Sequence, residues 1–185
     1  MDELKVIKGL KKGKRKFQKE VYNQYAPVFM AIGIRYLKSK HEAEDTVAEA
    51  FFKIFTKIKT YKNNGSFEGW MKRIMINECL MVLRKKQRSF LHIPLDNVEI
   101  EIPSDAVSQL GEDELLEMIA ELPEGYRTIF NLYVVEGYKH REIADMLDIS
   151  IHTSKSQLLM AKRKLQEELK KNRIRSLNNK LIQNG

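Results

Sequence analysis

Apolar residues recur at helical spacing in three stretches of the first half of the chain. These stretches run from Phe17 to Leu37, over residues 42–59, and from Phe67 to Arg88. Apolar positions three and four residues apart form one stripe along a helix, so the pattern predicts three amphipathic helices. Pro27 lies inside the first of them and is expected to kink or restart it. The lysine-rich residues 1–16 are expected to form a frayed lead-in.

The helical pattern fails in residues 92–111 and resumes at Glu112. Pro94 and Pro103 interrupt this segment, and acidic residues are scattered along it, as is typical of a linker. Further along, the stretch from Pro123 to Gly125 separates two more apolar stripes at helical spacing. The second half of the chain is therefore also expected to be helical.

Residues Tyr138 to Leu165 have the pattern of a helix-turn-helix. Ala144 is small enough for a second helix to approach closely, and Asp148 stands where the tight turn needs a left-handed backbone. Ser150 suits the N-cap of the second helix. The residues of that helix expected to face outward are Lys155, Ser156, Gln157, Met160, Lys162 and Arg163. Such a helix fits the major groove of DNA, whereas the alternative is an ordinary helical hairpin with a solvated basic face.

Together these patterns predict an all-α protein made of two small helical modules joined by a flexible linker. The first module covers residues 1–91 and the acidic linker covers residues 92–111. The second module, which contains the helix-turn-helix, covers residues 112–185.

Charge along the chain follows this division. The net charge of +8 favours a polyanionic partner. Residues 1–91 carry 21 Lys and Arg against 9 Asp and Glu, and residues 122–185 carry 12 against 7. Residues 92–121 carry 9 acidic residues and no basic ones. Two basic blocks therefore flank an acidic one, which suggests two DNA-facing modules and a connector of different character.

Other classes of function have little support in the sequence. Four scattered histidines and the single cysteine, Cys79, lack metal-ligand spacing, so no catalytic centre, metal or cofactor is expected. No apolar run approaches the ~18 residues of a membrane span, and the N-terminus lacks the apolar core of a signal peptide. The chain is therefore expected to be a cytoplasmic protein without enzymatic activity.

The segment from Tyr61 to Arg88 interleaves aromatic, amide and basic residues. Aromatic rings beside cations suit unstacked bases on a phosphate backbone, because each stacked base contributes about 1–3 kcal/mol. An amide such as Asn77 could supply hydrogen bonds to the edge of a flipped base. The alternative is that Phe67 and Trp70 are core residues and that the cations lie on a solvated face.

Several motifs, in this order, resemble those of bacterial RNA polymerase sigma factors. In region 2, His41–Phe55 (HEAEDTVAEAFFKIF) resembles the motif AED-x-x-Q-E-x-F, and Phe67–Asn77 (FEGWMKRIMIN) resembles F-x-x-W-L-x-R-I-A-x-N. In region 4, Leu122–Phe130 (LPEGYRTIF) resembles L-P-x-x-x-R-x-x-F, and the helix-turn-helix completes the region. Two regions without the third, in 185 residues, resemble the extracytoplasmic-function (ECF) group. The resemblance covers about residues 17–168.

The resemblance implies a role for each matching residue. Those implied to dock on the clamp coiled coil of core RNA polymerase are Asp45, Glu49, Phe52 and Lys53. Those implied to hold an unstacked base of the -10 element, or to lie near the DNA there, are Tyr61, Lys62, Asn63, Asn64, Ser66, Phe67, Trp70, Arg73, Asn77, Arg84, Lys85 and Arg88. Those implied to read the -35 element are Thr153, Lys155, Ser156, Gln157, Leu159, Met160 and Arg163.

The resemblance therefore implies an ECF-type sigma factor that binds core RNA polymerase and promoter DNA. It also implies an anti-sigma factor as a partner, because the family usually has one. The sequence departs from the family pattern at Ala48, which replaces a common glutamine, and at Ser154, which replaces a core valine. Gln157 and Met160 stand where arginines are frequent, which predicts fewer contacts with guanine bases in the -35 element.

Two other classes of protein remain open from the residues alone. One is a transcriptional repressor or activator that binds duplex DNA without polymerase, which would need a dimer interface. The other is a protein-interaction module whose basic faces are merely solvated. Co-purification with core RNA polymerase would separate all three.

Overall fold

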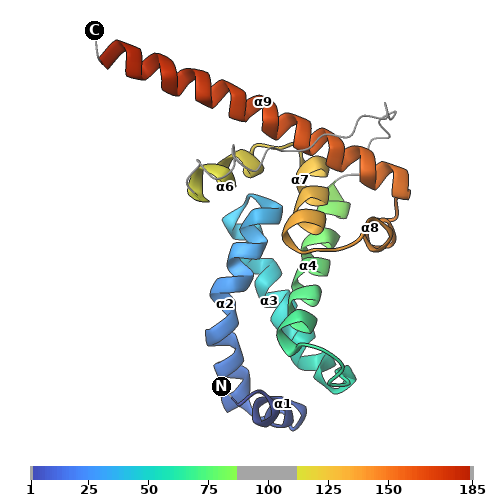
Figure 1. The fold of residues 1–185 in the computed structure, drawn as a ribbon. Helices are drawn as coiled ribbons and strands as arrows, with labels where there is room; N and C mark the ends of the chain where they lie inside the picture. Colours follow the sequence, from blue (N-terminus) through green and yellow to red (C-terminus); the bar gives the residue numbers. More distant parts are fainter. Residues whose placement is uncertain (1, 87–111, 184–185) are drawn as a thin grey trace. The chain divides into compact units, whose positions relative to one another are not determined.

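The structure is a computed structural model that describes residues 2–86 and 112–183, with the side chains of the second range described for residues 116–171. All regular structure in these ranges is helical, without a strand. The chain divides into two compact units, residues 1–88 and residues 89–185, and each is described by itself. The expected all-α fold with two helical modules is confirmed (Figure 1). The expected linker at residues 92–111 lies outside the described residues.

Three long helices build the core of the first unit. They are α2 (Arg15–Leu37), α3 (Lys40–Lys57) and α4 (Phe67–Lys86), and each packs against the other two (Figure 1). A short 3-10 turn, η1 (Ile58–Thr60), follows α3. The largest fully buried side chains in this unit are Phe29, Tyr36, Ile54, Phe67, Met71, Met75, Ile76, Leu80 and Leu83.

The helix α2 runs through Pro27 without a break. Pro27 is exposed, so its ring lies on the solvent side of the helix, where a missing hydrogen bond can be replaced by water. Six residues later, Gly33 brings α2 close to α3, because a Cβ atom there would lie 2.8 Å from the Cβ of Ala43. The absence of a side chain at Gly33 thus sets the close contact between these two helices.

The lysine-rich lead-in is an ordered helix, so the expectation that it is frayed was wrong. It forms α1 (Glu3–Lys11), capped by the Asp2 carboxylate, which accepts a hydrogen bond from the Lys5 amide at 3.2 Å. Its residues Val6, Ile7 and Leu10 are buried. These three positions form an apolar face that packs on α2, and the lysines lie around it. The sequence did not indicate this helix, because its few apolar positions lie among many lysines.

The second unit contains the predicted helix-turn-helix. Its elements are α6 (Glu112–Ala120), α7 (Glu124–Phe130), the wide π-type turn η2 (Asn131–Val135), α8 (His140–Leu147) and α9 (Ile151–Gln183). Both α7 and α8 pack against α9. The helix α9 continues beyond these contacts (Figure 1).

Arg127, from the LPEGYRTIF segment, lies buried between α6 and α7. Its Nη1 atom donates hydrogen bonds to the carbonyl oxygens of Leu122, at 2.8 Å, and Ala120, at 3.3 Å. Burial lowers the pKa of Arg127, while the nearby Glu124 and Glu121 carboxylates act in the opposite direction. The guanidinium thus satisfies the carbonyl group of the last residue of α6 and one carbonyl group in the turn that follows it. The arginine therefore fixes the turn between α6 and α7.

Candidate polymerase and nucleic-acid interfaces

The turn between η1 and α4 is held together by Tyr61. This residue is buried, and its hydroxyl donates a hydrogen bond to the Gly65 carbonyl at 2.6 Å. Its ring centroid lies 5.4 Å from that of Phe67 and 5.3 Å from that of Trp70. Phe67 is also buried, whereas Trp70 is partly exposed. The rings of Tyr61 and Phe67 thus pack inward and close the turn, which for Phe67 agrees with the alternative of a core residue.

The polar residues of this turn, in contrast, face outward as expected. Lys62, Asn63, Asn64 and Ser66 are all exposed. Asn63 and Gly65 have positive φ angles of 58° and 99°, so the backbone reverses sharply between them. The Ser66 hydroxyl accepts a hydrogen bond from the Gly69 amide at 3.2 Å, which caps the start of α4. A cation and two amides are therefore presented on a closed turn, called here the 62–66 turn.

One face of α4 continues from this turn. The spacing of the residues along the helix places Trp70, Arg73, Asn77, Met81 and Arg84 on the same side. Arg73, Met81 and Arg84 are exposed, and Trp70 and Asn77 are partly exposed. This face carries an indole, an amide and two guanidinium groups, which can stack on bases, bond to base edges and contact phosphates.

The remaining basic residues at the end of α4 have mixed surroundings. Lys85 is exposed, and Lys86 forms an ion pair with Glu42 of α3 at 2.6 Å. Arg88 lies outside the described residues. Of the two lysines that the structure describes here, Lys85 has the placement that matches an outward-facing role.

An exposed stripe along α3 carries the expected docking residues. Asp45, Glu49 and Phe52 are spaced four and three residues apart and are all exposed, so they share one face of the helix. The phenyl group of Phe52 is 64% exposed, although a ring of this size usually packs inside. The stripe thus combines one exposed apolar group with two carboxylates on the same helix face.

Lys53 does not belong to this exposed stripe. Its Nζ atom lies 2.6 Å from Oε2 of Glu78 and 3.6 Å from Oε1 of Glu49. The hydrogen bond from Lys53 to Glu78 raises the pKa of Lys53 above its usual value. Sequence reasoning missed Glu78, which is buried inside α4. The available signal was an acid in the otherwise apolar run around Cys79.

The turn of the helix-turn-helix has the predicted geometry. Asp148 has φ 56° and ψ 48°, the left-handed conformation expected there. The Ile149 amide donates to the Ala144 carbonyl at 3.1 Å. The Ser150 hydroxyl accepts a hydrogen bond from the Thr153 amide at 2.9 Å, so Ser150 is the N-cap of α9. These bonds close α8 and begin α9 within three residues.

The buried side of α9 is wider than the sequence indicated. Ser156 and Gln157 are only 2% and 3% exposed, and Thr153 is buried as well, so the expectation that Ser156 and Gln157 face outward is corrected. The Ser156 hydroxyl donates to the Thr153 carbonyl at 3.0 Å. A short hydroxyl can thus be satisfied by its own helix, and its polarity does not require exposure.

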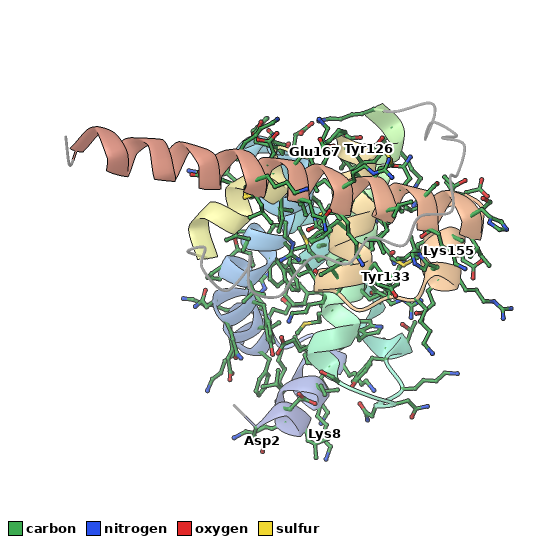
Figure 2. The ribbon with its side chains drawn as sticks, turned by 45° about the horizontal axis from the view of Figure 1, so that its top comes forward. Asp2, Lys8, Tyr126, Tyr133, Lys155 and Glu167 are labelled. Atoms are coloured by element: carbon green, nitrogen blue, oxygen red, sulfur yellow. The ribbon has the colours of Figure 1, made fainter. Side chains whose placement is uncertain are left out.

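The exposed and half-buried positions on α9 include the other expected -35 residues. Lys155 is exposed, and Leu159, Met160, Lys162 and Arg163 are half-buried. Figure 2 labels Lys155 and Tyr133, both of which lie toward the end of the unit where α9 begins. Lys155 is therefore the most accessible cation among the predicted -35 residues.

His140 links α8 to α9. Its Nδ1 atom lies 2.9 Å from the hydroxyl oxygen of the fully buried Ser154. The His140 ring also stacks on Tyr133, with centroids 4.4 Å apart. Burial and the charges of Lys155 and Lys162 lower the pKa of His140. The polar Ser154, which departs from the family's valine, thus has a partner that sequence reasoning missed.

The described parts of the chain lack two kinds of feature, a membrane-spanning helix and a metal-binding cluster. None of the helices there combines the length and apolar character needed to cross a membrane. The same ranges hold no cluster of three or more His, Cys, Asp or Glu side chains suited to a metal ion.

Two family models match the chain. Sigma-70 region 2 matches residues 21–89, and Sigma-70 region 4 matches residues 112–165. The first match falls in the first compact unit apart from its last residue, and the second match falls in the second unit. The order of the two regions is the one that the sequence motifs predicted.

Two relatives are similar over most of the chain. The ECF RNA polymerase sigma factor SigW of Bacillus subtilis is 28% identical over 182 residues, which cover 90% of this chain and 96% of SigW. The ECF RNA polymerase sigma factor SigE of Mycolicibacterium smegmatis is 30% identical over 159 residues, which cover 82% of this chain and 61% of that relative.

A solved structure shares the fold. It is the sigma factor RpoE of Bartonella quintana in complex with the anti-sigma factor NepR, with a TM-score of 0.53 and 22% identity. The match covers 82% of this chain and 96% of RpoE. Region 2, region 4 and the relatives all agree, so this chain belongs to the sigma-70 family of RNA polymerase sigma factors, within its ECF group.

Proposed function

We propose that this ECF sigma factor starts transcription through three separate surfaces of its two units. As a member of its family, the chain is a non-catalytic factor that directs RNA polymerase to specific promoters. The observation that carries the proposal is the match of regions 2 and 4, in order, to the two compact units. In this proposal residues 1–91 dock on polymerase and hold the -10 element, and residues 112–185 read the -35 element.

The proposed polymerase-docking surface is the exposed stripe of α3. Phe52 offers an apolar anchor, and Asp45 and Glu49 offer negative charge beside it. Such an anchor contributes most when a partner removes it from water, and the acids select a partner with basic residues. Lys53 is assigned a supporting role here, because its bond to Glu78 ties α3 to α4 below the stripe.

The proposed -10 surface combines the 62–66 turn with the exposed face of α4. Lys62, Asn63 and Asn64 would meet an unstacked base, and Asn77 would bond to its edge. Arg73 and Arg84 would contact the phosphates of the same strand. Tyr61 and Phe67 would act indirectly, by holding the turn closed. Ser66, Trp70, Lys85 and Arg88 complete the proposed set.

The proposed -35 surface is the first part of α9. Lys155, Leu159, Met160 and Arg163 carry this proposal, because their side chains are exposed or half-buried. Thr153, Ser156 and Gln157 keep their predicted role only if DNA binding uncovers them. A recognition helix presents its first turns to base edges, whereas later residues contact phosphate.

An anti-sigma factor and a cytoplasmic location complete the proposal. RpoE, which shares this fold, was solved together with an anti-sigma factor. Large apolar side chains are exposed on both units of this chain, namely Phe52 on α3 and Tyr133, Val134 and Val135 on η2. A protein that covered Phe52 would compete with polymerase for the same surface.

Transcription from a DNA library with randomised -35 and -10 segments tests the proposed function. Core RNA polymerase with the purified chain is expected to select one promoter class and form open complexes on it. Core enzyme alone is the control and is expected to select none. The chain alone is expected to bind duplex DNA poorly, because the 62–66 turn needs a strand that is already unstacked. Tight, sequence-specific duplex binding by a dimer of the chain would support a repressor instead.

A further inference from the structure

The first helix reaches the turn that the proposed function assigns to the -10 element. The Nζ atom of Lys11, the last residue of α1, donates a hydrogen bond to the carbonyl oxygen of Tyr61 at 2.9 Å. The bond is partly buried and joins residues fifty positions apart. It therefore links two segments that the sequence gives no reason to pair.

The helix α1, which carries Lys11, is firmly packed within the first unit. Val6, Ile7 and Leu10 are buried, and α1 packs against both α2 and η1. A Cβ atom on Gly9 would lie 2.0 Å from the ring of Phe17, so the helix backbone approaches α2 closely at this position. The Lys11 ammonium thus extends from a docked helix, and its position is set by the packing of α1.

Tyr61 is the residue at which the turn begins, and three kinds of contact converge on it. Its carbonyl accepts from Lys11, its hydroxyl donates to Gly65, and its ring packs against Phe67 and Trp70. The residues between Tyr61 and Gly65 are therefore closed into a short loop whose one anchor is fixed from outside by α1. A loop that is ordered before binding loses less conformational entropy when it binds.

The ammonium group of Lys11 makes a contact within the protein and does not extend into solvent. The ammonium bonds to a backbone carbonyl and is part-buried, whereas the neighbouring Lys12 is exposed. A lysine that serves DNA phosphate would extend into solvent. The two neighbours therefore offer a matched pair that separates a positioning role from simple charge.

We propose that α1 is a brace for the 62–66 turn and that Lys11 is its positioning residue. The brace holds the turn in the shape that receives an unstacked base, without touching DNA itself. This inference rests on the proposed -10 role of the turn, and it adds an element that the region 2 match, which begins at residue 21, does not include.

The test compares Lys11→Met with Lys12→Met in the full-length chain. Lys11→Met keeps the aliphatic stem and removes the donor. Hydrogen exchange of the Tyr61 and Gly69 amides, which donate to the Ile58 carbonyl and the Ser66 hydroxyl at the two ends of the turn, is therefore expected to become about five- to tenfold faster. With core polymerase, open-complex formation is expected to fall by a similar factor while core affinity stays unchanged. Lys12→Met is expected to leave exchange unchanged, and Lys11→Arg is expected to restore both readouts.

A second variant acts on the other end of the brace. Gly9→Val pushes α1 away from Phe17 and is expected to speed up exchange of the same amides, with the melting of α2, α3 and α4 still cooperative. Equal exchange and open-complex formation in Lys11→Met and Lys12→Met would overturn the brace. A weaker salt dependence for Lys11→Met with unchanged exchange would also overturn it, because Lys11 would then contact phosphate.

These outcomes can be told apart from a failure of the proposed function. If the unmodified chain formed no open complexes with core polymerase on any library member, the proposed function would fail. Exchange of the Tyr61 and Gly69 amides in the free chain would still decide whether Lys11 braces the turn.

Discussion

Lys53 of α3 and Glu78 of α4 form an ion pair, with 2.6 Å between Nζ and Oε2, at the edge of the first unit's core. The side chain of Glu78 is 9% exposed and that of Lys53 is 24% exposed. An acid buried to this degree needs a partner, because an unpaired charge there is costly. The pair therefore accounts for both the position of Glu78 in an apolar helix and the inward orientation of Lys53.

We expect Lys53→Met to lower the free energy of unfolding by about 1–3 kcal/mol, because it leaves Glu78 buried without its charged donor. Chemical denaturation of the full chain measures this loss. The matched control is Lys57→Met, one turn along α3 at an exposed position. The double variant Lys53→Met, Glu78→Leu is expected to recover part of the loss. If Lys53→Met were no less stable than Lys57→Met, the pair would have no structural role.

The same pair predicts a dependence on alkaline pH. The pKa of Lys53 is raised above its usual 10.5 in the folded chain. A raised folded-state pKa contributes stability that is fully present below 10.5 and is lost as the pH rises through the folded-state value. Above this range, the stability difference between the native chain and Lys53→Met is therefore expected to shrink. Denaturation of both proteins at neutral pH and above pH 10.5 measures the difference.

Charge reversal on α3 tests the docking surface. We expect the double variant Asp45→Arg, Glu49→Arg to weaken binding to core RNA polymerase at least tenfold, because it places positive charge beside Phe52 on the same helix face. The control is Glu44→Arg, a neighbouring exposed acid that lies off this face. Pull-down with core enzyme measures binding, and circular dichroism checks the fold. Unchanged binding by the double variant would remove α3 from the docking surface.

His140 predicts an acid-sensitive contact in the second unit. Its pKa lies below the usual 6.5, first because the ring is partly buried and then because of Lys155 and Lys162. A lowered folded-state pKa means that the unfolded chain takes up the proton first, so stability present above pH 6.5 is lost as the pH falls toward the folded-state value. We expect the melting temperature of the second unit to decrease below pH 6.5.

Two histidine variants isolate this effect. His140→Gln is expected to remove the acid-dependent part, whereas His152→Gln, at an exposed position at the start of α9, is expected to keep it. Thermal unfolding followed at several pH values measures both. An identical pH dependence in the two variants would mean that another group is responsible.

Local features of the chain were predictable from sequence, because they rest on short-range physics. The left-handed Asp148 and the N-cap Ser150 follow from backbone sterics and from orphan amides at a helix start. The long amphipathic helices follow from the helical spacing of the apolar residues alone. In each case the residues that determine the feature lie within a few positions of one another.

Features that depend on distant partners were not predictable in this way. The order of α1 depends on its packing against α2 and η1, and the lysine content of the segment gave the opposite expectation. The bond from Lys53 to Glu78 joins two helices, so neither residue alone indicates it. Tyr61 was expected at a base-binding rim, but its hydroxyl donates a hydrogen bond to the Gly65 carbonyl and its ring packs against that of Phe67. Side chains able to bind a base are equally able to build the turn that presents it.

On α9, exposure separates two proposed kinds of DNA contact. Lys155 is exposed in the first turns, where side chains reach base edges, and Arg163 is half-buried further along. We expect Lys155→Ala to change which -35 sequences are used. We expect Arg163→Ala to weaken all of them alike and to reduce the salt slope by about one unit, as for one lost phosphate contact. Transcription from a randomised -35 library at two salt concentrations measures both effects.

Gln157 gives the sharpest test of the -35 proposal. Its position in the sequence implies a base-reading residue, whereas its burial indicates a core residue. It matches a groove-facing position of the family, yet it is 3% exposed in this chain. If it reads bases, Gln157→Ala is expected to change the -35 preference while the melting temperature stays nearly constant. The same library, together with thermal unfolding of the free chain, measures both quantities. A loss of about 1–2 kcal/mol in stability with an unchanged preference would make Gln157 a core residue. Base reading would then rest on Lys155, Leu159 and Met160, and the recognition face of α9 would be narrower than the family position implies.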